Sequence, residues 1–258
     1  MFIDAFRQAC RDTGGCLCVG LDPHLDRIPD RFDTTAEGVH RFLCWIIEQT
    51  APYASAYKPN AAFFEVLGAA GMDVLKRVIE EIHAAGRPVI LDAKRGDISS
   101  TAKAYARAAF DVLGADAITV VPYMGEDAIV PFLEGGGYAF VLTLPTNPSS
   151  PEIVDHGEPP LYERVTRLAG ELNRRFRDQV GLVVGATRPA EARRIHEMAP
   201  ELGWLVPGIG AQGASVDAFG ELIADHDITV VNASRAVLFA DDPANAAWEL
   251  AERTGGKR

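Results

Sequence analysis

The sequence lacks the features of nucleic-acid-binding and membrane proteins. Its 258 residues carry 25 Lys and Arg against 36 Asp and Glu, a formal net charge of −11, and no basic block stands out. This balance argues against a nucleic-acid-binding surface. No apolar run approaches the roughly 18 residues of a membrane helix, and the first ten residues lack a signal-peptide pattern. We therefore expect a soluble, cytoplasmic protein without a nucleic-acid or membrane partner.

The usual signatures of metal, nucleotide-cofactor and serine-nucleophile sites are also missing. The four cysteines are Cys10, Cys16, Cys18 and Cys44, and no His or Cys cluster completes the C-x-C pair into a zinc pattern. None of the six histidines is paired as H-x-H or H-E-x-x-H, there is no G-x-S-x-G, and no G-x-G-x-x-G follows the first expected strand. We expect free, buried thiols and neither a metal nor a cofactor.

Short apolar runs alternate with segments of helical period along the chain. The runs are continuous rather than alternating, which is typical of parallel strands covered on both faces. Strands are expected at residues 16–21, 55–58, 88–93, 117–121, 138–144, 181–185, 204–207 and 228–232. Helices are expected at residues 35–49, 72–85, 99–113, 161–178, 189–198 and 244–253.

Eight such β-then-α units in about 250 residues are typical of a (β/α)₈ TIM barrel, an α/β fold. A doubly wound open sheet is the alternative, but it usually has fewer strands. No linker divides the chain, so residues 1–258 are expected to form one domain. The long irregular stretch at residues 146–160, rich in Pro, Ser and acidic residues, is expected to be an active-site lid. The alternative is a surface excursion without function.

The most informative stretch is LDAKRGDI at residues 91–98. Asp92 and Lys94 are two residues apart at the end of an apolar run, so on an extended strand their side chains share a face. Asp97 follows where the strand turns into a loop. With Lys58, at the end of the second expected strand, these groups can form an array of alternating charge in which all stay ionised. The alternative is a purely structural salt-bridge network.

Glycine-rich turns follow the last two expected strands. Barrels of this kind usually bind phosphate there, through backbone N–H groups. Arg235 adds a fixed positive charge with two-pronged donor geometry, and Gln212 adds an amide donor. The sequence therefore predicts a phosphate site, the alternative being that the glycines only form tight turns and Arg235 is a surface residue.

Seven motifs in order, VGLDPH, YKPNAAFFE, LDAKRGDI, PYMG, VVGAT, PGIGAQG and NASR, together resemble the orotidine 5′-phosphate decarboxylase family, in its bacterial AKRGD form. The resemblance spans residues 16–235. It implies a metal-free and cofactor-free (β/α)₈ homodimer that converts orotidine 5′-phosphate to uridine 5′-phosphate and CO₂, the last step of pyrimidine synthesis.

The resemblance also implies roles for individual residues. Lys94 would protonate C6 of the pyrimidine, with Lys58, Asp92 and Asp97 completing a charged tetrad. Asp97 and Thr101 would reach the partner's site. The other expected substrate-binding residues are Asp22 at the ribose, Gln212 and Arg235 at the phosphate, Ser234 beside Arg235, and Thr146, which stands where relatives have a serine at the pyrimidine.

Two other functions stay open. A sister decarboxylase that acts on a sugar phosphate would bind Mg²⁺ through an acid at the end of the second strand, but Lys58 stands there. A nucleotide-phosphate-binding barrel without catalysis is the second. Sensitivity to EDTA would support the magnesium enzyme, and ligand binding without turnover would support the binding barrel.

Overall fold

The computed structural model describes residues 1–208 and 228–255. Eight parallel strands form one sheet in the order β2-β1-β8-β7-β6-β5-β4-β3, which confirms the predicted (β/α)₈ barrel. The strands are β1 Leu17–Leu21, β2 Ala56–Pro59, β3 Ile90–Arg95, β4 Ala117–Val120, β5 Tyr138–Leu144, β6 Val180–Val184, β7 Gly203–Val206 and β8 Thr229–Ala233. Each lies within two residues of its predicted start and end.

The sheet closes where its first and last members meet. β2 and β3 approach through the isolated parallel bridges Tyr57–Val89 and Asn60–Asp92, and the Ala61 amide donates to the Asp92 carbonyl (3.1 Å). Parallel closure brings the carboxyl ends of all the strands to one rim of the barrel. Residues far apart in the sequence therefore meet at that rim.

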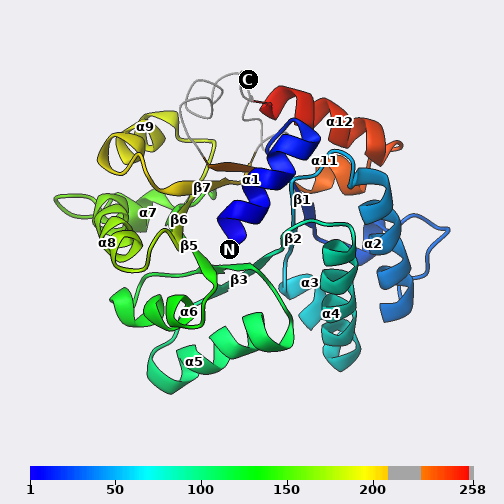
Figure 1. Cartoon of the computed structure of the whole chain (residues 1–258), viewed down its shortest axis with the longest axis horizontal. Coiled ribbons are helices and arrows are strands. Elements are labelled where there is room, and N and C mark those ends of the chain that lie inside the picture. Colours follow the sequence, from blue (N-terminus) through cyan, green and yellow to red (C-terminus); the bar gives the residue numbers. More distant parts are fainter. Residues whose placement is uncertain (209–227, 256–258) are drawn as a thin grey trace.

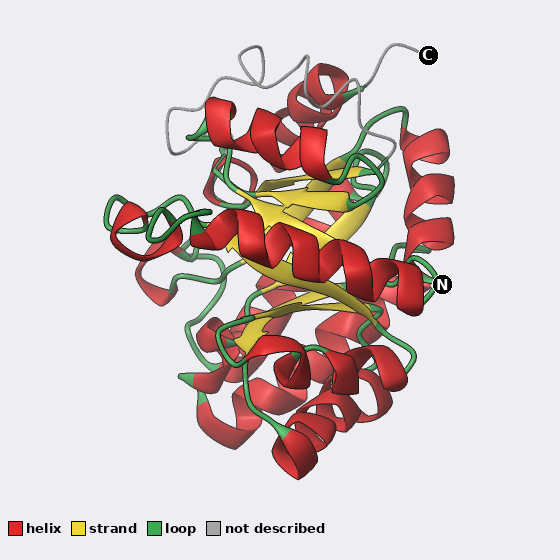
Figure 2. Ribbon diagram, turned by 90° about the vertical axis from the view of Figure 1, so that its left-hand side faces the viewer, coloured by secondary structure: helices red, strands yellow, loops and turns green. Residues whose placement is uncertain are grey.

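Helices surround the strands (Figures 1 and 2). The longer helices are α1 Phe2–Thr13, α2 Ala36–Thr50, α4 Gly68–Ala84, α5 Ser99–Arg107, α8 Leu161–Arg175, α9 Pro189–Met198 and α12 Pro243–Thr254. Shorter ones are α3 Ala62–Glu65, α6 Val130–Glu134, α7 Pro151–Val154 and α11 Arg235–Leu238. Each long helix that the sequence predicted turns its apolar stripe inward; in α2 this stripe includes Phe42, Leu43 and Ile46, all fully buried.

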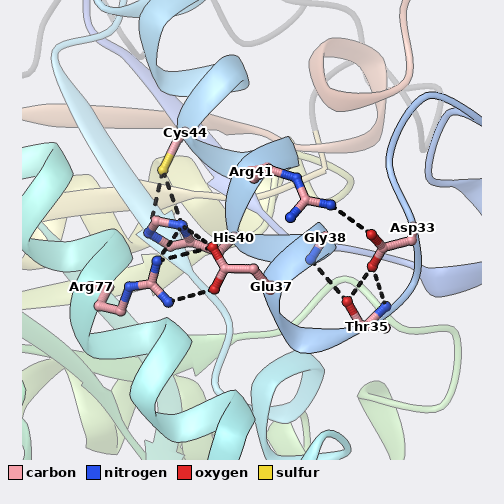
Figure 3. Close-up of polar contacts among 8 residues, drawn as sticks. All are labelled: Asp33, Thr35, Glu37, Gly38, His40, Arg41, Cys44 and Arg77. Carbon is pink, nitrogen blue, oxygen red and sulfur yellow. Dashed lines mark hydrogen bonds and ion pairs between the residues drawn. The ribbon is translucent and has the colours of Figure 1, made fainter.

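The start of α2 is fixed by local side-chain chemistry (Figure 3). The Thr35 hydroxyl caps the helix by accepting a hydrogen bond from the Gly38 amide (3.2 Å), and Asp33 holds Thr35 in turn. A Cβ at position 38 would lie 1.9 Å from the Asp33 carbonyl oxygen, so only glycine fits there. This cap fixes where α2 begins, four residues before His40.

Helix α1 was not among the predicted helices. Its buried residues Phe2, Ile3, Phe6 and Ala9 follow a helical period, so the signal was present in the sequence. Phe2 and Phe6 pack with Tyr138 and Phe140 in a second apolar cluster at the amino ends of the strands. In Figure 1, α1 lies across the middle of the ring, where it closes that end of the barrel.

Two other predictions need correction. The helix expected over residues 99–113 is α-helical only to Arg107 and continues as a π-helical turn, Ala108–Val112. The stretch 146–160 is not wholly irregular, because it contains α7, buries Val154 and Ser150, and pairs Asp155 with Arg188 at 2.8 Å. Within the two described ranges, no helix has the length and apolar character needed to cross a bilayer.

Candidate active site

A cavity of about 430 Å³ lies at the rim formed by the carboxyl ends of the strands. Its wall combines charged and polar side chains with apolar ones from the barrel interior. The residues that line it are Asp22, Lys58, Asp92, Lys94, Thr119, Leu142, Pro145, Thr146, Asn147, Val183, Leu205, Pro207, Gly208, Asn232, Ser234 and Arg235. Seven of the predicted site residues thus share one cavity, although they are spread over more than 200 positions of sequence.

Asp92 lies between two lysines. Its Oδ2 accepts from Lys58 Nζ at 2.9 Å, and its Oδ1 accepts from Lys94 Nζ at 2.7 Å. Only 5% of the Lys58 side chain and 10% of the Asp92 side chain are exposed, against 46% for Lys94. The Lys94 ammonium is therefore the cation of this array that a bound molecule can reach most easily.

The array keeps its buried members charged. Burial by itself would raise the pKa of Asp92, but Lys58 and then Lys94 outweigh it and hold that pKa well below its usual value. For Lys58, burial would lower the pKa, and the carboxylates of Asp92 and Asp22 outweigh it and raise the pKa instead. The site thus holds a fixed pattern of charge in a poorly solvated setting.

A bulge in β3 brings Lys94 to Asp92. The pairing of β3 with β4 shifts between Leu91 and Arg95, and Lys94 has a φ of 44°, which is unusual for a residue other than glycine. The two side chains meet as predicted, but the predicted reason, simple alternation along an extended strand, is wrong. Such strained backbone conformations concentrate at functional sites.

Thr119 of β4 holds this bulge, a role that was not predicted from the sequence. Its hydroxyl accepts from the amides of Ala93 (3.1 Å) and Lys94 (3.0 Å) and donates to Asp92 Oδ1 (2.9 Å). One buried side chain therefore fixes both the Lys94 backbone and the Asp92 carboxylate. The residue was missed because a threonine within an apolar strand has no distinguishing pattern before its cross-strand neighbours are known.

The side of the cavity formed by the carboxyl ends of β1 and β8 presents polar atoms that have no partner among the described residues. Asp22 Oδ1, Asn232 Oδ1 and Ser234 Oγ are buried without a hydrogen-bond partner among the described residues. Buried polar atoms that lack partners are costly, so they mark a place where a polar ligand supplies the hydrogen bonds. Arg235 lines the same side. Gln212, the other predicted phosphate ligand, lies outside the described residues.

Asp97 and Thr101 do not line the cavity of their own chain. Asp97 Oδ1 accepts a hydrogen bond from the Ile98 amide (2.8 Å), and Thr101 is exposed on α5. The structure thus brings together three members of the predicted tetrad within one chain and leaves Asp97 outside. Thr146 and its neighbour Asn147 do line the cavity.

The donor set of the cavity does not suit a metal ion. Both oxygens of Asp92 already accept from ammonium groups, and two lysines line the same wall. Hard divalent cations need several free oxygen ligands. Asp22 is the remaining carboxylate among the described lining residues.

Comparison with known proteins identifies relatives over nearly the full length. The profile of the orotidine 5′-phosphate decarboxylase / HUMPS family matches residues 15–250. An orotidine 5′-phosphate decarboxylase of Herpetosiphon aurantiacus is 46% identical over 245 residues, covering 93% of this chain and 90% of the relative. One of Roseiflexus castenholzii is 45% identical over 264 residues, covering 100% and 95%.

The fold has the same relatives. The structure of Leishmania donovani OMP decarboxylase superimposes with a TM-score of 0.85 at 41% identity, covering 98% of this chain and 96% of that one. Sequence and fold thus place the chain among the same proteins.

Proposed function

The chain belongs to the orotidine 5′-phosphate decarboxylase / HUMPS family, and we propose that the Lys58–Asp92–Lys94 array performs its chemistry. The relatives establish the activity as decarboxylation of orotidine 5′-phosphate to uridine 5′-phosphate in pyrimidine synthesis. The observation that carries our proposal is the carboxylate held between two ammonium groups in the cavity, with the outer ammonium half exposed.

The reaction needs a cation beside the carbon that loses CO₂. Cleavage of that C–C bond leaves its electron pair on C6 of the pyrimidine, in an sp² orbital that the ring delocalises poorly. Roughly 20 kcal/mol of stabilisation is required for such a reaction. In our proposal the Lys94 ammonium stabilises this carbanion and then gives it a proton, so the new C6–H bond takes its hydrogen from Nζ.

Asp92 and Lys58 prepare the position of Lys94. Asp92 orients the Lys94 ammonium through the 2.7 Å contact, and Lys58 neutralises the buried carboxylate from the other side. Because these dipoles and charges are fixed before substrate arrives, little reorganisation is needed during the reaction. Asp92 also repels the substrate carboxylate before it leaves.

The phosphate and ribose would bind at the side of the cavity formed by the carboxyl ends of β1 and β8. Arg235 and Ser234 contact the phosphate together with Gln212, Asp22 binds the ribose, and Thr146 contacts the pyrimidine. The unpartnered oxygens of Asp22 and Ser234 support this assignment. Binding energy released at the phosphate can draw residues 146–160 over the cavity, since Thr146 and Asn147 already line it.

We infer that the active form is a homodimer in which Asp97 and Thr101 complete the partner's site. Large apolar residues are exposed around this pair: Ile98 follows Asp97, Tyr105 lies one turn beyond Thr101 on α5, and Tyr123 after β4 is 83% exposed. Such a cluster is unfavourable in water and typical of a protein interface. A second copy of the chain is the occupant that also explains why Asp97 lies outside its own cavity.

We further infer a single catalytic domain that works in the cytoplasm. The eight strands form one sheet, and the candidate cavity lies at the rim of that sheet. All four cysteines are free, although Cys10 and Cys16 have their sulfur atoms 3.7 Å apart. Unbonded thiols at this separation are typical of a reducing compartment.

Turnover with and without a chelator tests the proposal. Purified protein is mixed with orotidine 5′-phosphate, with and without EDTA, and the loss of orotate absorbance is followed. We expect rapid loss that EDTA does not change. Loss that EDTA abolishes would contradict the metal-free mechanism, and binding without loss would contradict catalysis.

A further inference from the structure

A cluster of metal-ligating side chains lies outside the cavity, between α2 and α4. His40 and Cys44 are four residues apart on α2, so they lie one above the other on the same face. Glu81 of α4 completes the group, and a nitrogen, a sulfur and an oxygen atom of the three residues all lie within 4.8 Å of one another. The sequence did not reveal this cluster, because the third residue comes from another helix.

The separation of the cysteine sulfur from one histidine nitrogen matches that of two ligands of a tetrahedral ion. Cys44 Sγ lies 3.4 Å from His40 Nε2. For tetrahedral zinc, bond lengths of about 2.3 Å to sulfur and 2.0 Å to nitrogen place these two ligand atoms roughly 3.5 Å apart. Sγ also lies 3.8 Å from Nδ1, so the sulfur faces the ring, and a turn of the His40 ring would bring the Nε2 lone pair into line with an ion shared with Cys44.

We propose that His40, Cys44 and Glu81 form a Zn²⁺-binding site on the outer face of the barrel. An imidazole, a thiolate and a carboxylate are the three ligand types that zinc takes in proteins, and water would occupy the fourth position. Glu81 is exposed, so the ion has an entry path from solvent. The two negative ligands would balance the charge of the ion.

The surroundings of His40 support binding through Nε2. Figure 3 shows the Arg77 guanidinium beside the ring, with Nη2 2.9 Å from His40 Nδ1, while Arg77 also pairs with Glu37. With Nδ1 in contact with Arg77, Nε2 is the ring nitrogen that lies nearer to Cys44 Sγ, at 3.4 Å.

Binding would rearrange two protons. Because Arg77 can only donate, Nδ1 accepts and the neutral ring carries its proton on Nε2. The ring proton would move from Nε2 to Nδ1, which frees the Nε2 lone pair for zinc, and the new Nδ1–H would donate a hydrogen bond to Glu37 Oε1, which lies 3.8 Å from Nδ1 before the ion binds. Arg77 swings off the ring. Zinc would also displace the thiol proton of Cys44 into solvent, because the thiolate is the form that binds the metal.

Metal titration of the full-length protein tests the site. Zn²⁺ alone is titrated by calorimetry, and Co²⁺ is used as a spectroscopic probe of thiolate ligation. We expect one equivalent of Zn²⁺ per chain and a thiolate-to-cobalt charge-transfer band. Cys44→Ser should abolish the band and weaken Zn²⁺ binding at least tenfold, whereas Cys10→Ser, which alters another partly exposed thiol, should change neither.

Two further variants separate ligation from folding. Glu81→Gln alters an exposed residue and should weaken Zn²⁺ binding about tenfold with an unchanged circular dichroism spectrum. Arg77→Met removes the hydrogen-bond donor at Nδ1 of His40 and should tighten Zn²⁺ binding. A cobalt band that persists in Cys44→Ser, or Zn²⁺ binding that Glu81→Gln leaves unchanged, would overturn the proposal. Decarboxylase activity plays no part in these readouts, so the site is tested independently of the proposed function.

Discussion

At the scale of single residues, Asp92 organises the candidate site. A carboxylate this deeply buried would be costly alone, and two ammonium groups and one hydroxyl compensate it. If any one of these partners is removed, the remaining charged groups are still present but no longer hold the same positions. Rate should therefore depend on the groups that position Asp92 and Lys94 as well as on Lys94 itself.

Thr119→Val tests this at a positioning residue. The change removes the acceptor for the Ala93 and Lys94 amides and the donor to Asp92, with little change in volume. We expect kcat to fall at least about tenfold with KM nearly unchanged, because the lysine is displaced while the binding groups remain.

Thr143→Val is the matched control. Thr143 is equally buried on the neighbouring strand β5, but its hydroxyl donates only to the Val141 carbonyl (3.0 Å). The steady-state kinetics of Thr119→Val should differ clearly from those of Thr143→Val. Equal effects would mean that the Thr119 hydroxyl is merely structural.

Arg235→Ala tests the phosphate site. Loss of a charge-assisted hydrogen bond should raise KM for orotidine 5′-phosphate about 10-fold to 100-fold. The nucleoside orotidine, which has no phosphate, serves as the control substrate, and its slow turnover should not change. If both substrates lose activity equally, Arg235 does not bind the phosphate.

Charged residues could be predicted from the sequence, and their positioning partners could not. Lys58, Asp92 and Lys94 could be identified because charged residues directly after apolar strands are costly to bury unless they are paired. Thr119 and Asn232 sit inside such strands and gain their roles from neighbours on other strands. The metal-ligand cluster was missed for the same reason, since Glu81 lies 37 positions after Cys44.

At the scale of elements, apolar periodicity located the strands and most long helices. The exceptions have physical causes. Helix α1 precedes the first strand and so fell outside the expected β-then-α repeat, although its apolar period was regular. The β3 bulge depends on the register with β4, which no single-strand pattern contains.

One inter-element contact predicts a pH dependence. His83 of α4 contacts Asp116, just before β4, at 2.9 Å, and that hydrogen bond raises the pKa of His83. A group whose pKa is raised on folding stabilises below its unfolded pKa, near 6.5, and loses that contribution as pH rises through the folded value. We expect His83→Gln to lower the melting temperature more at pH 5.5 than at pH 8.5. An equal loss at both values would contradict an ionised pair.

At the scale of the whole molecule, the site is expected to be shared between two chains. Mixing tests this: Lys94→Ala and Asp97→Ala should each be inactive alone, because each lacks one member of the tetrad in every site. A heterodimer of the two regenerates one complete site and one doubly defective site. With random exchange, an equal mixture should recover roughly a quarter of wild-type activity.

The mixing experiment needs its own control. Each variant, unfolded and refolded alone, should stay inactive, and sedimentation should show dimers in all samples. Full activity in either variant alone, or no activity in the mixture, would contradict a site shared through Asp97.

The most direct test of the account is the turnover rate of Lys94→Ala together with its affinity for uridine 5′-phosphate. The account predicts a fall in kcat of at least about 10³-fold, because the cation and the proton donor are both lost, while product binding stays measurable. A variant that retains more than about a tenth of the wild-type rate would contradict Lys94 as the proton donor.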